Sequence, residues 1–239
     1  MNKRVAWLPG CIGLLMAVVA AAASTDHYTQ RPASPDGTGK FHEGREIAHV
    51  MGWQAAPWLE RAEREQEEGT PILLRELRLA PGMVVADIGA GSGYLSRRMA
   101  PLVAPGGKVI ATDVQPQMVA LLKTLAADPR YANVEPLLST ETQTRLPASS
   151  VDLAIMVDVY HELEFPYETL DSIVQALKPN GRVAFVEYRG EDPAVPIKLL
   201  HKMTEKQVRL EAERHGLKWE RTSERLPWQH LVIFRKASR

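Results

Sequence analysis

The sequence predicts an α/β fold built on a seven-stranded, mostly parallel sheet with helices on both faces. From residue 83 onward, strand-like and helix-like segments alternate, which is typical of a parallel sheet with crossover helices. Two strand-like segments, 153–157 and 183–186, are almost entirely apolar, as expected for strands covered on both faces. The last two strand-like segments lie too close together for a crossover helix, so we expect a C-terminal antiparallel hairpin.

The individual elements follow from apolar runs bounded by polar or turn-forming residues. The expected strands are 83–88, 108–113, 133–138, 151–157, 182–188, 217–223 and 229–235. The expected helices between them are 92–103, 116–127, 166–177 and 204–215. Pro116 suits a first helical turn, where a missing N–H costs nothing. Two further helices, over 58–68 and 71–79, precede the first strand, with Thr70 as the expected N-cap of the second.

The first 23 residues differ in composition from the rest of the chain. Lys3 and Arg4 precede an apolar stretch, 5–23, that ends in small residues, and this order is typical of a secretory signal. The stretch is also nearly long enough to span a bilayer uncleaved. We therefore expect residues 1–23 to be a signal peptide or membrane anchor. The globular part is then exported, either periplasmic or tethered to the outer face of the inner membrane.

The composition of the rest of the chain indicates how it is divided into segments and which functions it excludes. Residues 24–45 combine proline, glycine and polar residues and are expected to be a linker. Residues 46–80 are expected to form an N-terminal helical cap on a main domain at 81–239. The chain has 29 basic and 29 acidic residues, which gives no electrostatic case for nucleic-acid binding. The single cysteine, Cys11, lies inside the expected signal, so the exported chain would have no thiolate nucleophile and no disulfide.

A glycine-rich segment separates the first strand of the main domain from its helix. It runs Asp87-Ile88-Gly89-Ala90-Gly91-Ser92-Gly93. Glycines permit positive φ and let a ligand lie against the backbone, and the helix start behind them offers free N–H groups. The second strand ends in Asp113, twenty residues after Gly93. A carboxylate there can accept both hydroxyls of a ribose, as in dinucleotide-binding folds.

The spacing of the glycines distinguishes two kinds of cofactor. Dinucleotide folds use G-x-G-x-x-G against a pyrophosphate, whereas this turn reads G-x-G-x-G after Asp87. An acid at that place disfavours a pyrophosphate and favours a cationic amino-acid group. The segment resembles motif I of the class I S-adenosylmethionine-dependent methyltransferases. Residues 109–113 resemble their second strand with its ribose-binding acid. The resemblance continues through Leu146-Pro147, 150–154 and 177–183 and covers roughly residues 70–235.

This resemblance implies a Rossmann-like fold, S-adenosylmethionine as cofactor and a role for each strand end. Asp87 and the glycine turn would hold the methionine part, Asp113 the ribose, and Val114 would pack on the adenine side. Thr140 or Glu141 would replace an acid that the family often places after the third strand. The implied cofactor-binding residues are Asp87, Gly89, Ala90, Gly91, Ser92, Gly93, Asp113, Val114, Thr140 and Glu141.

The fourth strand is followed by candidate catalytic residues. Methyl transfer is an in-line displacement, for which an enzyme positions the nucleophile and, where needed, removes its proton. Asp158 or His161 could be that base, and Tyr160 could line the methyl site. A carboxylate metal site like that of catechol-type O-methyltransferases needs further acids beside Asp158. No such set is evident in the sequence, so we expect no metal.

The expected function is therefore S-adenosylmethionine-dependent methyl transfer. We expect a small-molecule acceptor, because no large recognition domain is appended to the predicted fold. Two alternatives stay open: a non-catalytic S-adenosylmethionine-binding protein and a nicotinamide-dependent oxidoreductase. The glycine spacing and the C-terminal hairpin argue against the second. The first gains weight from the expected export, because S-adenosylmethionine is made in the cytoplasm. The acceptor and the oligomeric state are not predicted.

Overall fold

The central sheet has the predicted architecture. A computed structural model of the chain describes residues 27–237. Its main sheet has the strand order β10-β11-β8-β7-β4-β5-β6, and the short strand β9 pairs with β8 beside this path. The strands are β4 (Val84–Ile88), β5 (Lys108–Asp113), β6 (Val134–Leu138), β7 (Val151–Val157), β8 (Leu177–Arg189), β9 (Lys202–Met203), β10 (Leu217–Ser223) and β11 (Gln229–Lys236).

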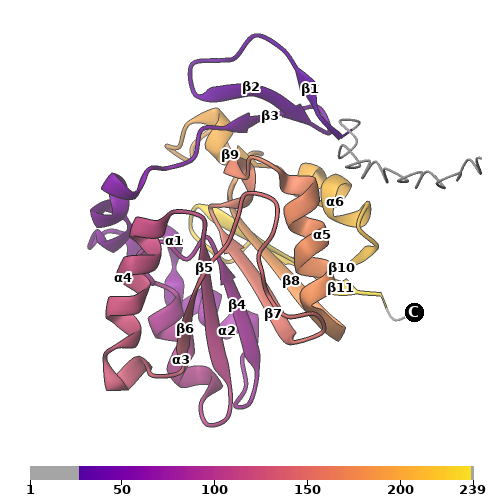
Figure 1. The fold of residues 1–239 in the computed structure, drawn as a ribbon. Coiled ribbons are helices and arrows are strands. Elements are labelled where there is room, and N and C mark those ends of the chain that lie inside the picture. The colour runs from indigo at the N-terminus through magenta and orange to yellow at the C-terminus, as the bar shows by residue number, and fades with distance from the viewer. Residues whose placement is uncertain (1–26, 238–239) are drawn as a thin grey trace, which may run out of the picture.

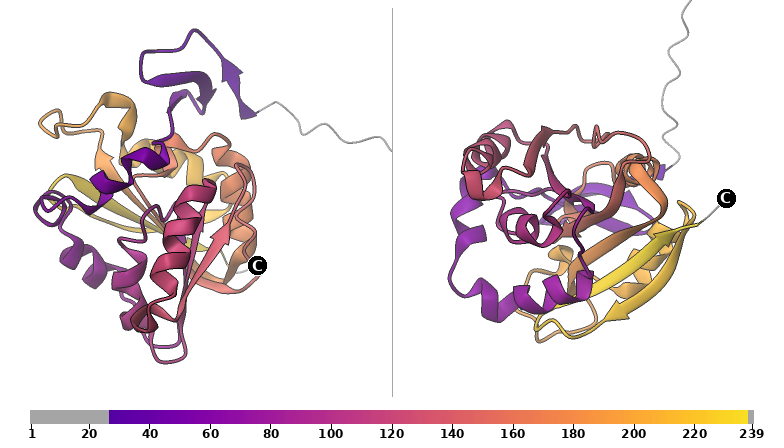
Figure 2. Two further views of the ribbon diagram at one scale, coloured as in Figure 1. Left: turned by 60° about the vertical axis from the view of Figure 1, so that its left-hand side comes forward. Right: turned by 90° about the horizontal axis from the view of Figure 1, so that it is seen from below.

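The pairing directions confirm the mostly parallel sheet and its C-terminal hairpin. Strands β6, β5, β4, β7 and β8 are parallel to one another. Strand β11 runs antiparallel to β8, and β10 antiparallel to β11. The yellow hairpin therefore closes one edge of the sheet (Figure 2). All five parallel strands consequently end on the same side of the sheet.

Helices cover both faces of this sheet (Figures 1 and 2). They are α2 (Thr70–Leu77), α3 (Ser96–Val103), α4 (Pro116–Ala126), α5 (Pro166–Ala176) and α6 (Glu205–Glu213). Proline occupies the first turn of α2, α4 and α5, where its fixed φ suits a helix. The N-cap of α2 is Gly69 rather than the expected Thr70. The Thr70 hydroxyl instead pairs with the Tyr94 hydroxyl at 3.2 Å.

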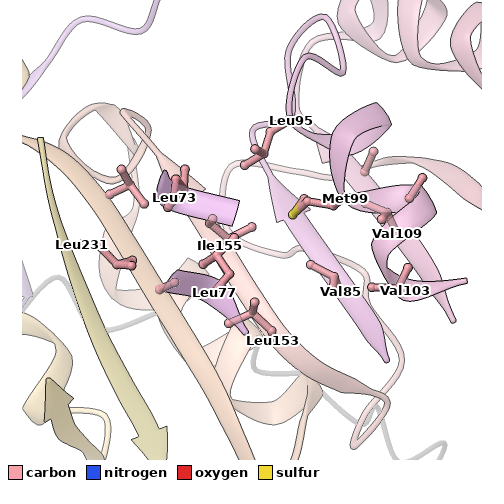
Figure 3. Close-up of a cluster of buried hydrophobic side chains, with 14 of the residues drawn as sticks. Leu73, Leu77, Val85, Leu95, Met99, Val103, Val109, Leu153, Ile155 and Leu231 are labelled. Atoms are coloured by element: carbon pink, nitrogen blue, oxygen red, sulfur yellow. The ribbon is translucent and has the colours of Figure 1, made fainter. Parts of the chain in front are cut away.

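The core has two layers because successive strand side chains point to opposite faces. Leu153 and Ile155 of β7 pack in the layer that contains α2 and α3, whereas Ala154 and Met156 pack in the layer that contains α5 and α6. Figure 3 shows the first layer, with Met99 of α3 against the strands. The unbroken apolar run of β7 is thus explained by burial on both faces.

The N-terminal part of the described chain is a second, three-stranded antiparallel sheet. It consists of β1 (Thr29–Gln30), β2 (Gly37–His42) and β3 (Arg45–Ala48), and it lies at the top of the molecule in Figure 1. The linker expected over 24–45 is therefore wrong from residue 29 onward. The glycines that indicated a linker, Gly37 and Gly39, lie within strand β2 instead, and Gly44 forms the turn between β2 and β3 with φ 88°. The backbone is further ordered by the Glu46 carboxylate, which accepts the N–H of Ser34 at 3.0 Å and of Gly39 at 2.9 Å.

A buried arginine is among the residues that attach this small sheet to the main domain, together with Lys40, which donates to Glu164. Arg45 Nε donates to Glu211 Oε1 of α6 at 2.7 Å. The same guanidinium donates to the backbone carbonyls of His161 at 3.0 Å and Tyr160 at 3.3 Å. Strand β3 is thereby held over the loop that follows β7.

Residues between the two sheets are helical, as expected for most of 46–80. The helices are η2 (Trp53–Glu60), α1 (Arg64–Glu68) and α2. Within residues 27–237, no helix is long and apolar enough to cross a membrane. The expected signal or anchor at 1–23 lies outside the described residues.

Candidate functional site

A cavity lies beyond the carboxyl ends of β4, β5, β6 and β7. Seven of the residues predicted from the sequence line it: Gly89, Gly91, Asp113, Val114, Thr140, Glu141 and Asp158. The segment before α2 contributes the opposite wall, with Val50, Met51, Trp58, Leu59 and Arg64. The cavity thus lies between the strand ends and the N-terminal part of the chain.

The ends of β4 and β5 are joined by hydrogen bonds at this cavity. Asp113 Oδ2 accepts the backbone N–H of Gly91 at 3.1 Å, and Oδ1 accepts that of Gln115 at 2.9 Å. Burial raises the pKa of Asp113, although these backbone donors act in the opposite direction. The acid predicted to bind a ribose is therefore fixed on the cavity wall by the turn predicted to bind the rest of the cofactor.

The glycine turn requires glycine for two reasons. Gly89 and Gly91 have φ of 66° and 55°, a region that residues with a Cβ rarely adopt. A Cβ on Gly91 would also lie 2.6 Å from Leu59 Cδ1, and one on Gly89 would lie 2.7 Å from Val159 Cγ2. Bare backbone therefore forms this wall, as expected where an extended ligand lies against it. Together with the buried acid of β5, the wall fits a nucleoside cofactor with an amino-acid extension.

Four predicted residues do not line the cavity: Asp87, Ala90, Ser92 and Gly93. Asp87 Oδ2 accepts from the Ser96 hydroxyl of α3 at 2.6 Å, and burial raises the pKa of Asp87 to about 6. The Ser92 hydroxyl donates to Glu60 at 2.6 Å. Direct contact of these residues with a ligand stays a prediction.

Asp158 directly follows β7 and faces the cavity. Its backbone has φ 53°, a strained conformation of the kind that clusters at functional sites. Oδ2 accepts from Gln229 Nε2 at 2.6 Å, whereas Oδ1 is buried without a hydrogen-bond partner among residues 27–237. Burial, with Glu68 and Glu187 nearby, raises the pKa of Asp158 well above the usual range. A raised pKa makes the ionised carboxylate a stronger base, so Asp158 in its ionised form can accept a proton from an acceptor.

Tyr160 and His161 do not line the cavity, so the expected lining role of Tyr160 is wrong. The 3-10 turn η4 (Tyr160–Glu162) directs Tyr160 into the core, where its fully buried ring packs against Phe185 at 4.9 Å between centroids. His161 is also buried. Its Nδ1 pairs with Glu187 Oε2 at 2.7 Å, and its Nε2 lies 3.1 Å from His201 Nδ1. Of the predicted bases, only Asp158 lies on the cavity wall.

Sequence reasoning missed Glu162 and Arg64. Glu162 completes the η4 turn and lines the cavity. Its Oε2 accepts the N–H of Met51 at 2.9 Å, and burial raises its pKa to about 7. The turn that hides Tyr160 places Glu162 outward, which the residue spacing does not reveal. Arg64 reaches the cavity through tertiary packing, and no local pattern indicates this.

Comparison with known proteins gives matches to methyltransferases. A family model described as "Methyltransferase domain" matches residues 86–183. A mitochondrial ubiquinone biosynthesis O-methyltransferase of Schizosaccharomyces pombe is 29% identical over 46% of this chain and 40% of its own length. The ubiquinone/menaquinone biosynthesis C-methyltransferase UbiE of Ectopseudomonas mendocina is 28% identical over 45% and 43%. The chain thus spans less than half the length of these two curated relatives.

A solved structure covers more of the fold. The crystal structure of an S-adenosylmethionine-dependent methyltransferase from Aquifex aeolicus aligns with a TM-score of 0.74 and 26% identity. The alignment covers 79% of this chain and 100% of that one. The likeness therefore extends beyond the glycine turn to most of the described fold.

Proposed function

Because the chain belongs to the class I S-adenosylmethionine-dependent methyltransferases, we propose that it transfers a methyl group from S-adenosylmethionine to a small-molecule acceptor. The observation that carries the proposal is the shared cavity of Gly91, Asp113 and Asp158. Gly91 and Asp113 lie at the ends of β4 and β5 and would hold the cofactor. Asp158 lies at the end of β7 and would face the acceptor.

The cofactor, when bound, supplies a methyl group on a positively charged sulfur. The protein then has to bring the acceptor atom into line with that methyl group and exclude water. An acceptor that carries a proton loses it to Asp158, whose Oδ1 has no competing hydrogen bond in the described chain.

The walls of the cavity support a small, largely apolar acceptor. Val50, Met51, Trp58 and Leu59 form the wall contributed by the N-terminal segment, and Leu163 adds to it from the loop after β7. Such surfaces bind apolar or aromatic molecules, while a few polar groups fix their orientation. Three of the relatives have names that concern small molecules, namely ubiquinone, menaquinone and arsenite, and a fourth is named for a malonyl group on an acyl-carrier protein.

We also propose that the protein acts outside the cytoplasm. The support is the order of Lys3, Arg4 and the apolar stretch 5–23. The proposal requires cofactor to reach the exported domain, so cellular location and cofactor binding need separate tests.

Calorimetry with S-adenosylmethionine, S-adenosylhomocysteine and NAD tests the cofactor class. We expect the first two to bind and NAD not to bind. Transfer of a labelled methyl group to a panel of small hydroxy, thiol and quinol-type compounds then tests for catalysis. Cofactor binding without turnover of any acceptor would favour the non-catalytic binding protein. Binding of NAD alone would contradict the proposed function.

A further inference from the structure

Two histidines and a glutamate meet at the edge of the cavity. His161 and Glu162 belong to η4, and His201 ends the short helix η5 (Leu199–His201). One potential ligand atom from each residue lies within 4.8 Å of the other two. The chain thus brings together residues that are 40 positions apart in the sequence, which is why no sequence spacing reveals the cluster.

The geometry of the two imidazoles suits a shared metal ion. His161 Nε2 and His201 Nδ1 are 3.1 Å apart. With bonds of about 2.0–2.1 Å, these nitrogens would subtend roughly 100° at a metal ion, between octahedral and tetrahedral angles. Without a metal, one ring donates a proton to the other. An ion would replace that proton but would lie to one side of the line between the two nitrogens, so the two rings would turn slightly to direct their lone pairs at it.

A second carboxylate already orients the buried histidine. Glu187 Oε2 lies 2.7 Å from His161 Nδ1, so a proton on Nδ1 leaves the lone pair of Nε2 directed at His201. Metal-binding histidines commonly have such a carboxylate partner, which sets the tautomer and the ring orientation. Glu187 is completely buried and also accepts the backbone N–H of Tyr160 at 2.9 Å. The partner is therefore rigidly placed before any ion binds.

We propose that His161, Glu162 and His201 form a binding site for one divalent transition-metal ion of the Zn²⁺ type. Two nitrogens and one carboxylate oxygen favour Zn²⁺, Co²⁺ or Fe²⁺ over Mg²⁺ and Ca²⁺, which prefer oxygen ligands. The carboxylates of Glu162 and Glu187 would balance the two positive charges. Three protein ligands leave at least one coordination position for water or an acceptor atom.

Only one of the three proposed metal ligands lines the cavity. Glu162 lines the cavity as well as belonging to the cluster, whereas His161 and His201 do not line it. The ion would therefore lie at the cavity edge on the β7 side, where the acceptor is proposed to bind. This part of the inference depends on the proposed function. An ion at this place would restrict the possible acceptors to molecules with an oxygen or sulfur atom that can bind the ion.

Metal binding can be measured without any acceptor. The full-length protein, without a histidine tag and stripped with chelator, is titrated with Zn²⁺ by calorimetry and with Co²⁺ by visible absorption. We expect one ion per chain and a cobalt spectrum of nitrogen and oxygen ligation. Loss of a direct ligand in His201→Ala should weaken Zn²⁺ affinity by about 100-fold or more, since loss of an orienting partner alone costs 10- to 100-fold. Glu187→Gln should weaken it by about 10- to 100-fold, because an amide N–H facing His161 Nδ1 favours the wrong tautomer.

His49→Ala is the matched control. His49 is exposed and outside the cluster, so Zn²⁺ affinity should stay within about twofold of wild type in this variant. Absence of Zn²⁺ and Co²⁺ binding, or equal affinities in wild type and His201→Ala, would overturn the metal site. Calorimetry of S-adenosylhomocysteine with metal-free protein separates the two proposals. If the protein binds S-adenosylhomocysteine but no metal ion, only the metal site is disproved. If it binds a metal ion but no S-adenosylhomocysteine, only the proposed function is disproved.

Discussion

The backbone N–H of Gly91 donates to the carboxylate of Asp113 at 3.1 Å, so the turn after β4 and the acid that ends β5 form one unit. This bond holds one oxygen of Asp113, the N–H of Gln115 holds the other at 2.9 Å, and together they fix the rotamer of the acid. Both residues line the cavity. A cofactor that contacts one should therefore be sensitive to changes at the other.

Replacing Asp113 by alanine should weaken S-adenosylmethionine binding by about 1.5–3 kcal/mol, the usual cost of losing hydrogen bonds to a charged group. Calorimetry of the purified variant measures this directly. Glu135→Ala is a suitable control, because Glu135 is an exposed acid on the neighbouring strand β6 and does not line the cavity. Unchanged affinity in a folded Asp113→Ala variant would disprove the ribose-binding role.

Substitution of Gly91 should affect cofactor binding more than an equally strained glycine elsewhere. In Gly91→Ala the new Cβ would meet Leu59 Cδ1 at 2.6 Å and would push it or the turn into the cavity. Gly82→Ala has similar backbone strain, with φ 86°, but no atom within 4 Å of the new Cβ. Each variant should lose about 1–2 kcal/mol of folding stability from the left-handed backbone, and only Gly91→Ala should lose cofactor affinity. Equal affinities in calorimetry would argue against a ligand at this turn.

Local sequence patterns predicted the main sheet well because its strands are buried on both faces. Strands β5 and β7 begin and end at the predicted residues, since each apolar run stops where the chain leaves the core. Strand β10 also does so, although most of its residues are exposed or half-buried. The small N-terminal sheet was missed for the opposite reason. It is ordered by long-range polar contacts, such as Arg45 with Glu211, and its strands have no apolar run.

The predicted strand-end residues Asp113 and Asp158 line the cavity, whereas those predicted one turn later do not. Asp113 and Asp158 follow directly from the rule that ligands bind beyond the carboxyl ends of parallel strands. Tyr160, His161 and Glu162 lie in a 3-10 turn, whose side-chain directions depend on how the turn packs. Tyr160, which was expected to line the methyl site, is therefore in the core, and Glu162, to which no role was assigned, lies on the cavity wall.

The ion pair of Arg45 and Glu211 should contribute strongly to stability. Arg45→Ala leaves Glu211 buried without its charged partner and should cost about 3–5 kcal/mol in the free energy of unfolding. Arg214→Ala, which breaks the exposed pair with Glu43, should cost less than about 1 kcal/mol. Urea denaturation at pH 7 measures both losses. Similar losses in the two variants would show that the small sheet is not held by the buried pair.

This pair also predicts a pH dependence. Burial opposes ionisation of Glu211, but the charge of Arg45 outweighs it and lowers the pKa of Glu211 below 4.5. A lowered folded-state pKa stabilises the fold fully above the ordinary glutamate value and loses that contribution as pH falls through the folded value. Wild type should therefore lose stability below about pH 4.5. In thermal denaturation, the double variant Arg45→Met/Glu211→Gln should lose less stability than wild type over the same pH range.

Export can be tested on the native protein. Fractionation followed by N-terminal sequencing should find the protein in the periplasm without its first residues, up to about residue 23, or in the inner membrane with those residues retained. An alkaline phosphatase fusion to residues 1–45 should be active if this segment directs export. Replacing Lys3 and Arg4 in the same fusion by glutamate should reduce its activity. A soluble cytoplasmic protein that begins at Met1 would contradict the proposed location.

Asp158 should be needed for turnover but not for cofactor binding. Asp158→Asn should retain S-adenosylmethionine affinity and lose about 10²- to 10⁴-fold in rate if the acceptor gives up a proton, as is typical for loss of a general base. Asp152→Asn is the matched control, because Asp152 lies at the opposite end of β7 and does not line the cavity. Wild-type rates in Asp158→Asn on the true acceptor would exclude this base.

The hydrogen bond from Gln229 to Asp158 offers a sharper test through the pH–rate profile. Burial, followed by Glu68 and Glu187, raises the pKa of Asp158, and the 2.6 Å bond from Gln229 Nε2 lowers it in part. Only the ionised acid can accept a proton, so the rate should rise with pH through this raised pKa. Gln229→Leu removes the donor and leaves the ionised form less stable, which should move the rise in rate to higher pH. The maximal rate should change less than in Asp158→Asn, because the base is still present. A profile that does not move, in a variant that binds cofactor normally, would show that the pH dependence arises from another group.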